Sequence, residues 1–121
     1  MNNVILNGRL VNDIELRFTK EGLALGKGSI AVDKGLSKEK KQEFEALGKP
    51  TADFINFSFF GGQAEFLANY TEKGARILLR GRIQTSTYKD QQTGKNNYYT
   101  EVVGQEVEIF DWKDRKETYR K

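Results

Sequence analysis

Hydrophobic and polar residues alternate along several short stretches of the chain, which is the pattern of strands with one buried face. A kink is expected at residues 12–13, and a tight turn ends at Gly22. The stretches predicted to form strands are residues 4–10 with a continuation over 14–19, and residues 23–33, 52–60, 75–88 and 98–110. The pattern therefore predicts five strands.

The connections between these strands differ in character. Residues 34–50 are rich in Lys, Glu and Gly with little apolar periodicity, and the only proline closes them, so we predict a long mobile loop. Residues 63–73 carry apolar side chains at roughly helical spacing, and Gly74 stands where a C-terminal cap is expected, so we predict a helix. Residues 89–97 contain a glycine turn, which makes the last two strands a long hairpin.

These elements predict an all-β fold class. Five strands with one helix between the third and the fourth give the element order of an oligonucleotide-binding (OB) barrel, with the fourth and fifth strands as its long hairpin. The 121 residues suffice for one domain. We assign residues 1–110 to the barrel and residues 111–121 to a short C-terminal tail.

The composition excludes most kinds of catalytic site. The chain has no cysteine and no histidine, so it lacks disulfides, thiolate ligands and the commonest general base. It contains no phosphate-binding loop of the G-x-x-x-x-G-K-[ST] type. We therefore expect a binding module with no enzymatic activity, no cofactor and no metal site.

Charge and hydropathy bear on the partner and the location. The formal net charge of +3 is mild and suggests a polyanionic partner. No stretch approaches the roughly 18 apolar residues of a membrane span, and the N-terminus lacks the layout of a signal peptide. We expect a cytoplasmic protein with no membrane partner.

The stretch 52–60 presents two different sides. By strand alternation they carry Ile55, Phe57 and Phe59 on one side and Phe54, Asn56, Ser58 and Phe60 on the other. The first side is predicted to be core. The second side combines two large aromatic rings with short polar residues, which does not suit a packed interior. We predict that its rings contact a flat partner.

The stretch 75–88 divides in the same way, and one of its sides carries Arg76, Leu78, Arg80, Arg82 and Tyr88. Aromatic rings beside a basic track are what binding of single-stranded DNA without sequence preference requires. Any base can stack on a ring, while Arg and Lys side chains contact the phosphates. Leu78 fits an oligomer contact better than a DNA contact.

Other interpretations of these residues remain open. Exposed aromatic residues also cover subunit interfaces, and arginines on a strand are often only solvated, which would describe a structural protein-interaction barrel. An RNA-directed OB protein is a further alternative, with a preference for single-stranded RNA. The lysines of the 34–50 segment, including Lys34 and Lys49, fit either a solvated loop or a flap over a nucleic-acid groove.

Several segments carry a more specific pattern in their order and spacing. They are NVILNGRL at 3–10, ELRF at 15–18 with Gly22, SIAV at 29–32, FFG at 59–61 with AE at 64–65, KG at 73–74, GRI at 81–83 and YTEVV at 99–103. With these segments the chain resembles the single-stranded DNA-binding protein family from residue 3 to residue 110. The resemblance implies base stacking at Phe54, Phe60 and Tyr88.

The resemblance also implies an assembly and a phosphate-binding set. Members of the family usually form homotetramers through their barrels, so we expect a homotetramer, with a homodimer as the smaller alternative. Arg17 is added to the phosphate contacts mainly on this resemblance. The predicted phosphate contacts are Arg17, Arg76, Arg80, Arg82, Lys34 and Lys49.

The chain departs from the family pattern at several positions. The family's stacking position in the loop after the second strand falls near Leu36, which is not aromatic, and Phe44 is a candidate substitute. Ile14 stands where many members carry proline, and Gly28 where many carry a bulky core residue. These differences are expected to change local packing and to leave the fold intact.

The expected function is to coat exposed single-stranded DNA during replication, recombination and repair. The expected setting is the bacterial cytoplasm, in association with the nucleoid, or a phage-infected cell. Many bacterial members continue into a linker and an acidic tip that recruits partner enzymes, whereas this sequence stops at Lys121. It is therefore either a truncated chain or a naturally tailless form, and recruitment of replication and repair proteins is doubtful.

Overall fold

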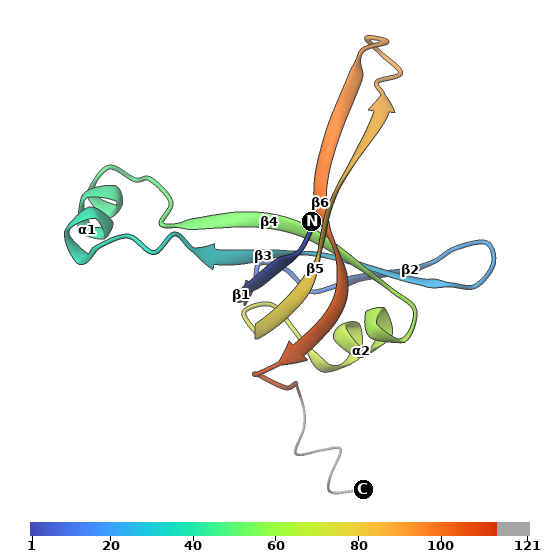
Figure 1. Cartoon of the computed structure of the whole chain (residues 1–121), viewed down its shortest axis with the longest axis horizontal. Coiled ribbons are helices and arrows are strands. Elements are labelled where there is room, and N and C mark those ends of the chain that lie inside the picture. The colour runs from blue at the N-terminus through green and yellow to red at the C-terminus, as the bar shows by residue number, and fades with distance from the viewer. Residues whose placement is uncertain (114–121) are drawn as a thin grey trace, which may run out of the picture.

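The computed structural model describes residues 1–113. Figure 1 shows strands curving around a common core, with one helix against the barrel and another on a projecting arm. In chain order the elements are β1 (Val4–Leu10), β2 (Glu15–Phe18), β3 (Ala24–Asp33), α1 (Lys38–Ala46), β4 (Ala52–Phe60), α2 (Gly62–Tyr70), β5 (Arg76–Lys89) and β6 (Asn96–Ile109). Across residues 1–113, neither helix has the length and apolar character needed to cross a membrane.

Strand β1 closes the sheet into a barrel. On one side it pairs with β5 from Val4 to Arg9, and on the other it pairs with β3 at Arg9 and Leu10. The sheet order is β1-β5-β6-β4-β3-β2, so the pairing of β1 with β3 joins the first and fifth strands of this order. With α2 between β4 and β5, this arrangement confirms the predicted five-stranded OB barrel. The kinked first strand of the prediction corresponds to β1 and β2.

The core lies inside this barrel. Phe57 and Phe59 are almost fully buried and pack edge-to-face, with ring centroids 5.9 Å apart. Both point inward from β4, as the alternation predicts. The other large side chains that are fully buried include Ile30, Leu67, Ile77 and Leu79. The apolar residues of α2 therefore cover one end of the barrel.

Gly28 is required because its neighbours occupy the space that a side chain would need. A Cβ atom at Gly28 would lie 2.9 Å from Cδ1 of Ile14 and 2.9 Å from Cζ of Phe57. Such distances are well below ordinary van der Waals contact. The two unusual residues Ile14 and Gly28 are therefore a matched pair, because the isoleucine and Phe57 fill the space left by the glycine.

The segment predicted as a long loop contains helix α1. The Ser37 hydroxyl caps it by accepting a hydrogen bond from the backbone N–H of Lys40 at 3.2 Å, and Lys40 forms an ion pair with Glu43 at 3.7 Å. None of its residues is buried. The loop prediction was wrong because a helix that buries none of its residues needs no apolar periodicity.

Helix α2 ends at Tyr70, earlier than the predicted residue 73. Thr71 takes an extended conformation and its backbone N–H donates to the carbonyl of Leu67. Gly74 is therefore not the helix cap. Its φ of +90° belongs to the turn into β5, where its N–H donates to the carbonyl of Leu10 at 2.9 Å.

Residues 111–113 contact the barrel. Arg76 donates from Nε and Nη2 to the two carboxylate oxygens of Asp111, at 3.0 and 3.1 Å. The Trp112 ring packs edge-on against Phe66 and Tyr70 of α2, with centroids 5.2 and 5.6 Å away. The rest of the predicted tail, residues 114–121, lies outside the described residues. The division of the chain after residue 110 stays a prediction.

The Asp111 contact predicts a specific dependence of stability on acid. The hydrogen bond from the Arg76 side chain is the main cause that lowers the pKa of Asp111 from 3.8 to about 2. Because the folded-state pKa is depressed, this stabilisation is present above pH 3.8 and is lost as the pH falls toward about 2. Asp111→Asn should therefore destabilise the chain at pH 7 and have a smaller effect near pH 2.

Urea unfolding at both pH values, followed by fluorescence of the sole tryptophan, measures this difference. Glu21→Gln is the control, because Glu21 is an exposed turn carboxylate without an ion pair among residues 1–113. An Asp111→Asn effect that is equal at both pH values would contradict the prediction.

Candidate functional site

The strand register places the three predicted stacking residues on one exterior face of the barrel. Side chains that are paired across neighbouring strands point to the same side of a sheet. Phe60 pairs with Leu25 of β3, and Phe54 pairs with Ala31. The same side continues through β6 to β5, by way of the pairs Ser58 with Val103, Val103 with Arg82, and Asn97 with Tyr88. We call this side, which carries Phe54, Phe60 and Tyr88, the aromatic face.

The rings of the aromatic face are open to solvent. Phe54 is 62% exposed, Phe60 46% and Tyr88 59%. Asn56, between the two phenylalanines, is also exposed. Ser58 was predicted to be exposed with them, but it is buried because β3 and β6 flank β4 at this point, and its hydroxyl has no hydrogen-bond partner among the described residues.

Two of the predicted phosphate contacts share the aromatic face. Arg17 of β2 pairs with Leu25, which in turn pairs with Phe60, so the guanidinium lies near the Phe60 end of the face. Arg17 forms an ion pair with Glu15. Arg82 of β5 is exposed and donates to Oε1 of Gln84 at 3.0 Å.

Lys27 is a third cation on this face, and sequence reasoning missed it. It pairs with Ser58 across β3 and β4, and its Nζ lies 5.7 Å from the ring centroid of Tyr99. No ion pair involves it among residues 1–113. The alternation of Lys27 with the inward glycines Gly26 and Gly28 was the signal that could have identified it.

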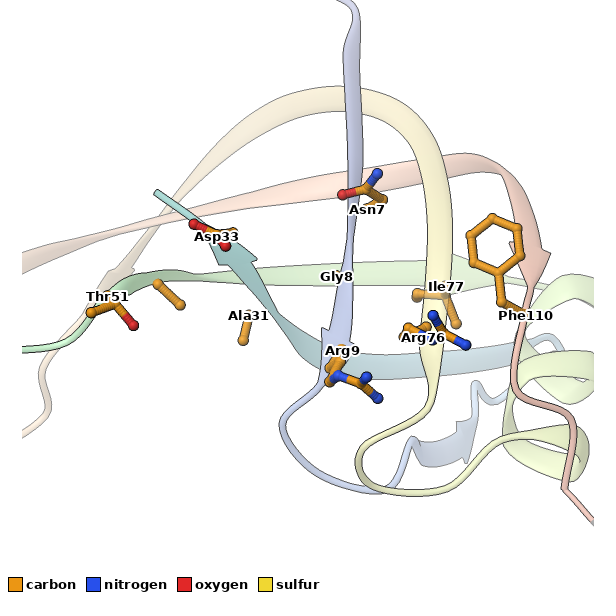
Figure 2. A pocket seen from close by; sticks show the side chains of 10 residues that line it. Asn7, Gly8, Arg9, Ala31, Asp33, Thr51, Arg76, Ile77 and Phe110 are labelled. Atoms are coloured by element: carbon orange, nitrogen blue, oxygen red, sulfur yellow. The ribbon is translucent and has the colours of Figure 1, made fainter. Parts of the chain in front are cut away.

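Arg76 and Arg80 lie on a different side of the barrel. Arg80 pairs with Ile5 of β1 and forms an ion pair with Glu106 of β6. Arg76 pairs with Arg9 of β1 and is bound to Asp111. Figure 2 shows Arg9 and Arg76 beside a cleft of about 480 Å³, whose lining includes none of Phe54, Phe60 and Tyr88. The structure therefore divides the predicted arginine row into two separate groups.

The predicted loop lysines are both engaged. Lys34 forms an ion pair and hydrogen bond with Asp53 at the start of β4. Lys49 lies over the Phe44 ring at 5.7 Å, on the arm that carries α1. Phe44 and Leu36 are half-buried. The arm thus holds a lysine–aromatic pair of its own.

Leu78 lies on the β1–β5 side, away from the aromatic face. It pairs with Asn7, and the neighbouring residue on that side, Ile5, is 62% exposed. Both line a shallow hollow of about 180 Å³ that Glu106 and Glu108 border. This side combines exposed apolar area with paired charges.

Two acidic groups of the described chain, Tyr99 and Glu101, have unusual surroundings. Within residues 1–113, no group of three Asp or Glu side chains is arranged to hold a metal ion. Burial, followed by the charge of Glu101, raises the pKa of the Tyr99 phenol. Glu101 is itself buried, and its Oε2 has no hydrogen-bond partner among the described residues.

Comparison with known proteins relates the whole barrel to one family. The sequence model of the "Single-strand binding protein family" matches residues 1–110. "Single-stranded DNA-binding protein 4" of Streptococcus agalactiae is 42% identical over 114 residues, which cover 94% of this chain and 77% of that protein. "Single-stranded DNA-binding protein 3" of Clostridium acetobutylicum is 43% identical over 113 residues, covering 93% and 72%. "Single-stranded DNA-binding protein" of Clostridium tetani is 43% identical over 117 residues, covering 96% and 74%.

Proposed function

The chain belongs to the single-strand binding protein family, and we propose that it binds single-stranded DNA through the aromatic face. The observation that carries this proposal is the exposure of three large rings, Phe54, Phe60 and Tyr88, on one side of the barrel. A soluble domain that exposes such rings together loses apolar burial unless a partner covers them. Nucleobases are flat apolar partners of the required kind.

Base stacking and phosphate contacts make separate contributions to binding in this proposal. Bases stack on the rings irrespective of their identity, while Arg17, Lys27 and Arg82 contact the phosphates. Duplex DNA hides the faces of its bases, so the aromatic face selects single strands. Arg76 and Arg80 are bound to carboxylates on another side, and we leave them out of the phosphate contacts.

A coated strand is protected from hairpin formation and from nucleases, which suits replication, recombination and repair. No reaction is catalysed in this proposal. The relatives quoted above are bacterial proteins named for DNA binding, which supports the bacterial cytoplasm as the setting.

We also propose that the β1–β5 side with Ile5 and Leu78 joins copies of the chain into a homotetramer. The exposed Ile5 and the half-buried Leu78 lie away from the aromatic face, so that assembly leaves the DNA surface free. The mass of the chain in solution distinguishes a tetramer from a dimer and from a monomer.

The proposed function is tested by fluorescence anisotropy of a labelled dT strand at several salt concentrations. Matched duplex DNA and single-stranded RNA are titrated in parallel. Tight, salt-sensitive binding of the dT strand with weak duplex binding supports the proposal. Stronger binding of RNA would favour an RNA-directed protein, and no salt-sensitive binding to any strand would favour a protein-interaction barrel.

Arg82→Gln should make binding of the dT strand less sensitive to salt. Each phosphate contact on a single strand contributes about 0.7 to the slope of log affinity against log salt concentration. The slope should therefore fall by about 0.7 in this variant. Arg80→Gln is the matched control, because Arg80 is paired with Glu106 on another side and its loss should leave the slope unchanged. Since Arg80 also borders the hollow with Ile5 and Leu78, the mass of this variant in solution is compared with that of wild type. If the slope falls equally in both variants, Arg80 also contacts phosphates and the division of the arginines is wrong.

A further inference from the structure

A polar hollow lies within the aromatic face, beside the rings. It has a volume of about 250 Å³ and is lined by Lys27 and Ser29 of β3, Asn56 of β4 and Tyr99 of β6. Asn56 is two residues from Phe54 and on the same side of β4, so the two side chains are roughly 7 Å apart along the strand. A base beside one that stacks on Phe54 would therefore meet this hollow.

The Asn56 amide is held in one orientation. The Ser29 hydroxyl donates to Oδ1 of Asn56 at 2.6 Å, across the β3–β4 pair. This bond uses one of the two lone pairs of the amide oxygen, and the amide NH₂ group keeps both of its donors. No group among residues 1–113 accepts a hydrogen bond from that NH₂ group, and Asn56 is exposed. The amide therefore offers donors to a ligand.

Lys27 adds a second donor to the hollow, because its ammonium group, over the Tyr99 ring, can only donate hydrogen bonds. The carboxylates at the rim each have one partner: Asp13 accepts from the backbone N–H of Lys73 at 2.7 Å, and Glu15 is paired with Arg17. A base beside Phe54 would therefore meet the Asn56 amide and the Lys27 ammonium as donors.

We propose that Asn56 is a specificity-determining residue that favours pyrimidines with a carbonyl at C4, which are thymine and uracil, over cytosine. A carbonyl accepts from the Asn56 NH₂ group, whereas the C4 amino group of cytosine is itself a donor and would remain unpaired. Ser29 is the positioning residue, because its hydrogen bond fixes which end of the amide faces the base. The inference rests on the proposed function and adds a modest base preference to stacking that accepts any base.

The test compares binding of dU and dC strands of equal length by anisotropy at pH 8. These strands differ at the C4 substituent and the adjacent N3, so their ratio of affinities isolates the edge that Asn56 would read. One hydrogen bond contributes about 0.5–1.5 kcal/mol, so wild type should prefer dU by about 2- to 12-fold. Asn56→Ala should bring the ratio close to one.

Asn56→Asp should reverse the preference, because a carboxylate accepts from the cytosine amino group. Ser29→Ala should weaken the preference without reversing it, since the freed amide can rotate to suit either base. Asn69→Asp on α2 is the control for the added negative charge, because Asn69 is exposed on the helix surface. It should lower both affinities at most slightly and leave their ratio unchanged.

The outcomes separate this inference from the proposed function. If wild type binds both strands and the ratio is the same in Asn56→Ala and Asn56→Asp, Asn56 does not read the base and the inference fails while DNA binding stands. If wild type binds neither strand, the proposed function fails as well. Urea unfolding of each variant checks that loss of the Ser29–Asn56 hydrogen bond does not change the free energy of unfolding enough to explain a change in binding.

Discussion

Phe60→Ala should weaken binding of a dT strand by about 5- to 150-fold. Removing one aromatic partner of a base costs about 1–3 kcal/mol, and the ring of Phe60 is 46% exposed on the aromatic face. Since the lost contact is apolar, the salt dependence of binding should remain as in wild type. Anisotropy titrations at several salt concentrations measure both quantities.

Phe18→Ala is the matched control for this variant. The Phe18 ring is 60% exposed, but it pairs with the inward-facing Ala24 and therefore points away from the side that carries Arg17 and Leu25. Its loss should leave affinity within about twofold of wild type. If Phe60→Ala and Phe18→Ala weaken binding equally, stacking on the aromatic face is not the source of affinity.

Tyr98 allows a similar distinction on the hairpin. It is 77% exposed and pairs with Thr87, so it belongs to the opposite side of β5 and β6 from Tyr88. The two tyrosines are close in the same hairpin. A difference in affinity for the dT strand between Tyr88→Ala and Tyr98→Ala would therefore report on the direction in which each ring points and not on its distance from the barrel. Phe18 on β2 and Tyr98 on β6 therefore serve as exposed aromatic references for the rings of the aromatic face on β4 and β5.

Gly104→Ala should destabilise the fold by about 3 kcal/mol or more. A Cβ atom at this position would overlap the Phe59 ring, which is fully buried and has no free space to move into. Overpacking of a core typically costs 1–3 kcal/mol, and an overlap with several ring atoms belongs at or above the upper end of that range. Urea unfolding at a fixed protein concentration measures the change.

Two further variants make this prediction specific to the ring. Gly62→Ala at the start of α2 should change stability by less than about 0.5 kcal/mol, since nothing lies within 4 Å of its Cβ position. Phe59→Leu combined with Gly104→Ala should be less destabilising than the sum of the single changes, because the smaller side chain relieves the overlap. If the two losses of stability simply add, the destabilisation by Gly104→Ala does not come from its contact with Phe59.

The alternation along β4 was sufficient to predict which of its large side chains face the core. Phe57 and Phe59 are buried and Phe54 and Phe60 are exposed, as the pattern of β4 indicates. On β5 the exception is Ile83, which shares a side with Ile77 and Leu79 but is 47% exposed. Strand β1 pairs with β5 only as far as Gly81, so Ile83 has a neighbouring strand on the β6 side alone. Figure 1 shows the far end of the β5–β6 hairpin projecting from the barrel.

The sequence did not reveal which of the exposed groups would meet one another. Lys27 joins the aromatic face through pairing of β3 with β4, and its contact with Tyr99 joins residues that are distant in the chain. Helix α1 escaped prediction because it buries none of its residues and so leaves no periodic signal. Asp111 was assigned to a tail, yet its bond to Arg76 depends on where β6 ends relative to β5.

The sequence by itself determined the barrel, its core and the rings exposed on β4, because strand alternation is a local property of the backbone with a period of two residues. Only the tertiary structure decided the directions in which exposed residues face. Arg76, Arg80 and Arg82 all point to the same side of β5. However, the strand curves around the barrel, and it pairs with both β1 and β6 as far as Gly81 but with β6 alone after that residue. Arg82 therefore lies on the aromatic face, whereas Arg76 and Arg80 reach Asp111 and Glu106 on another side.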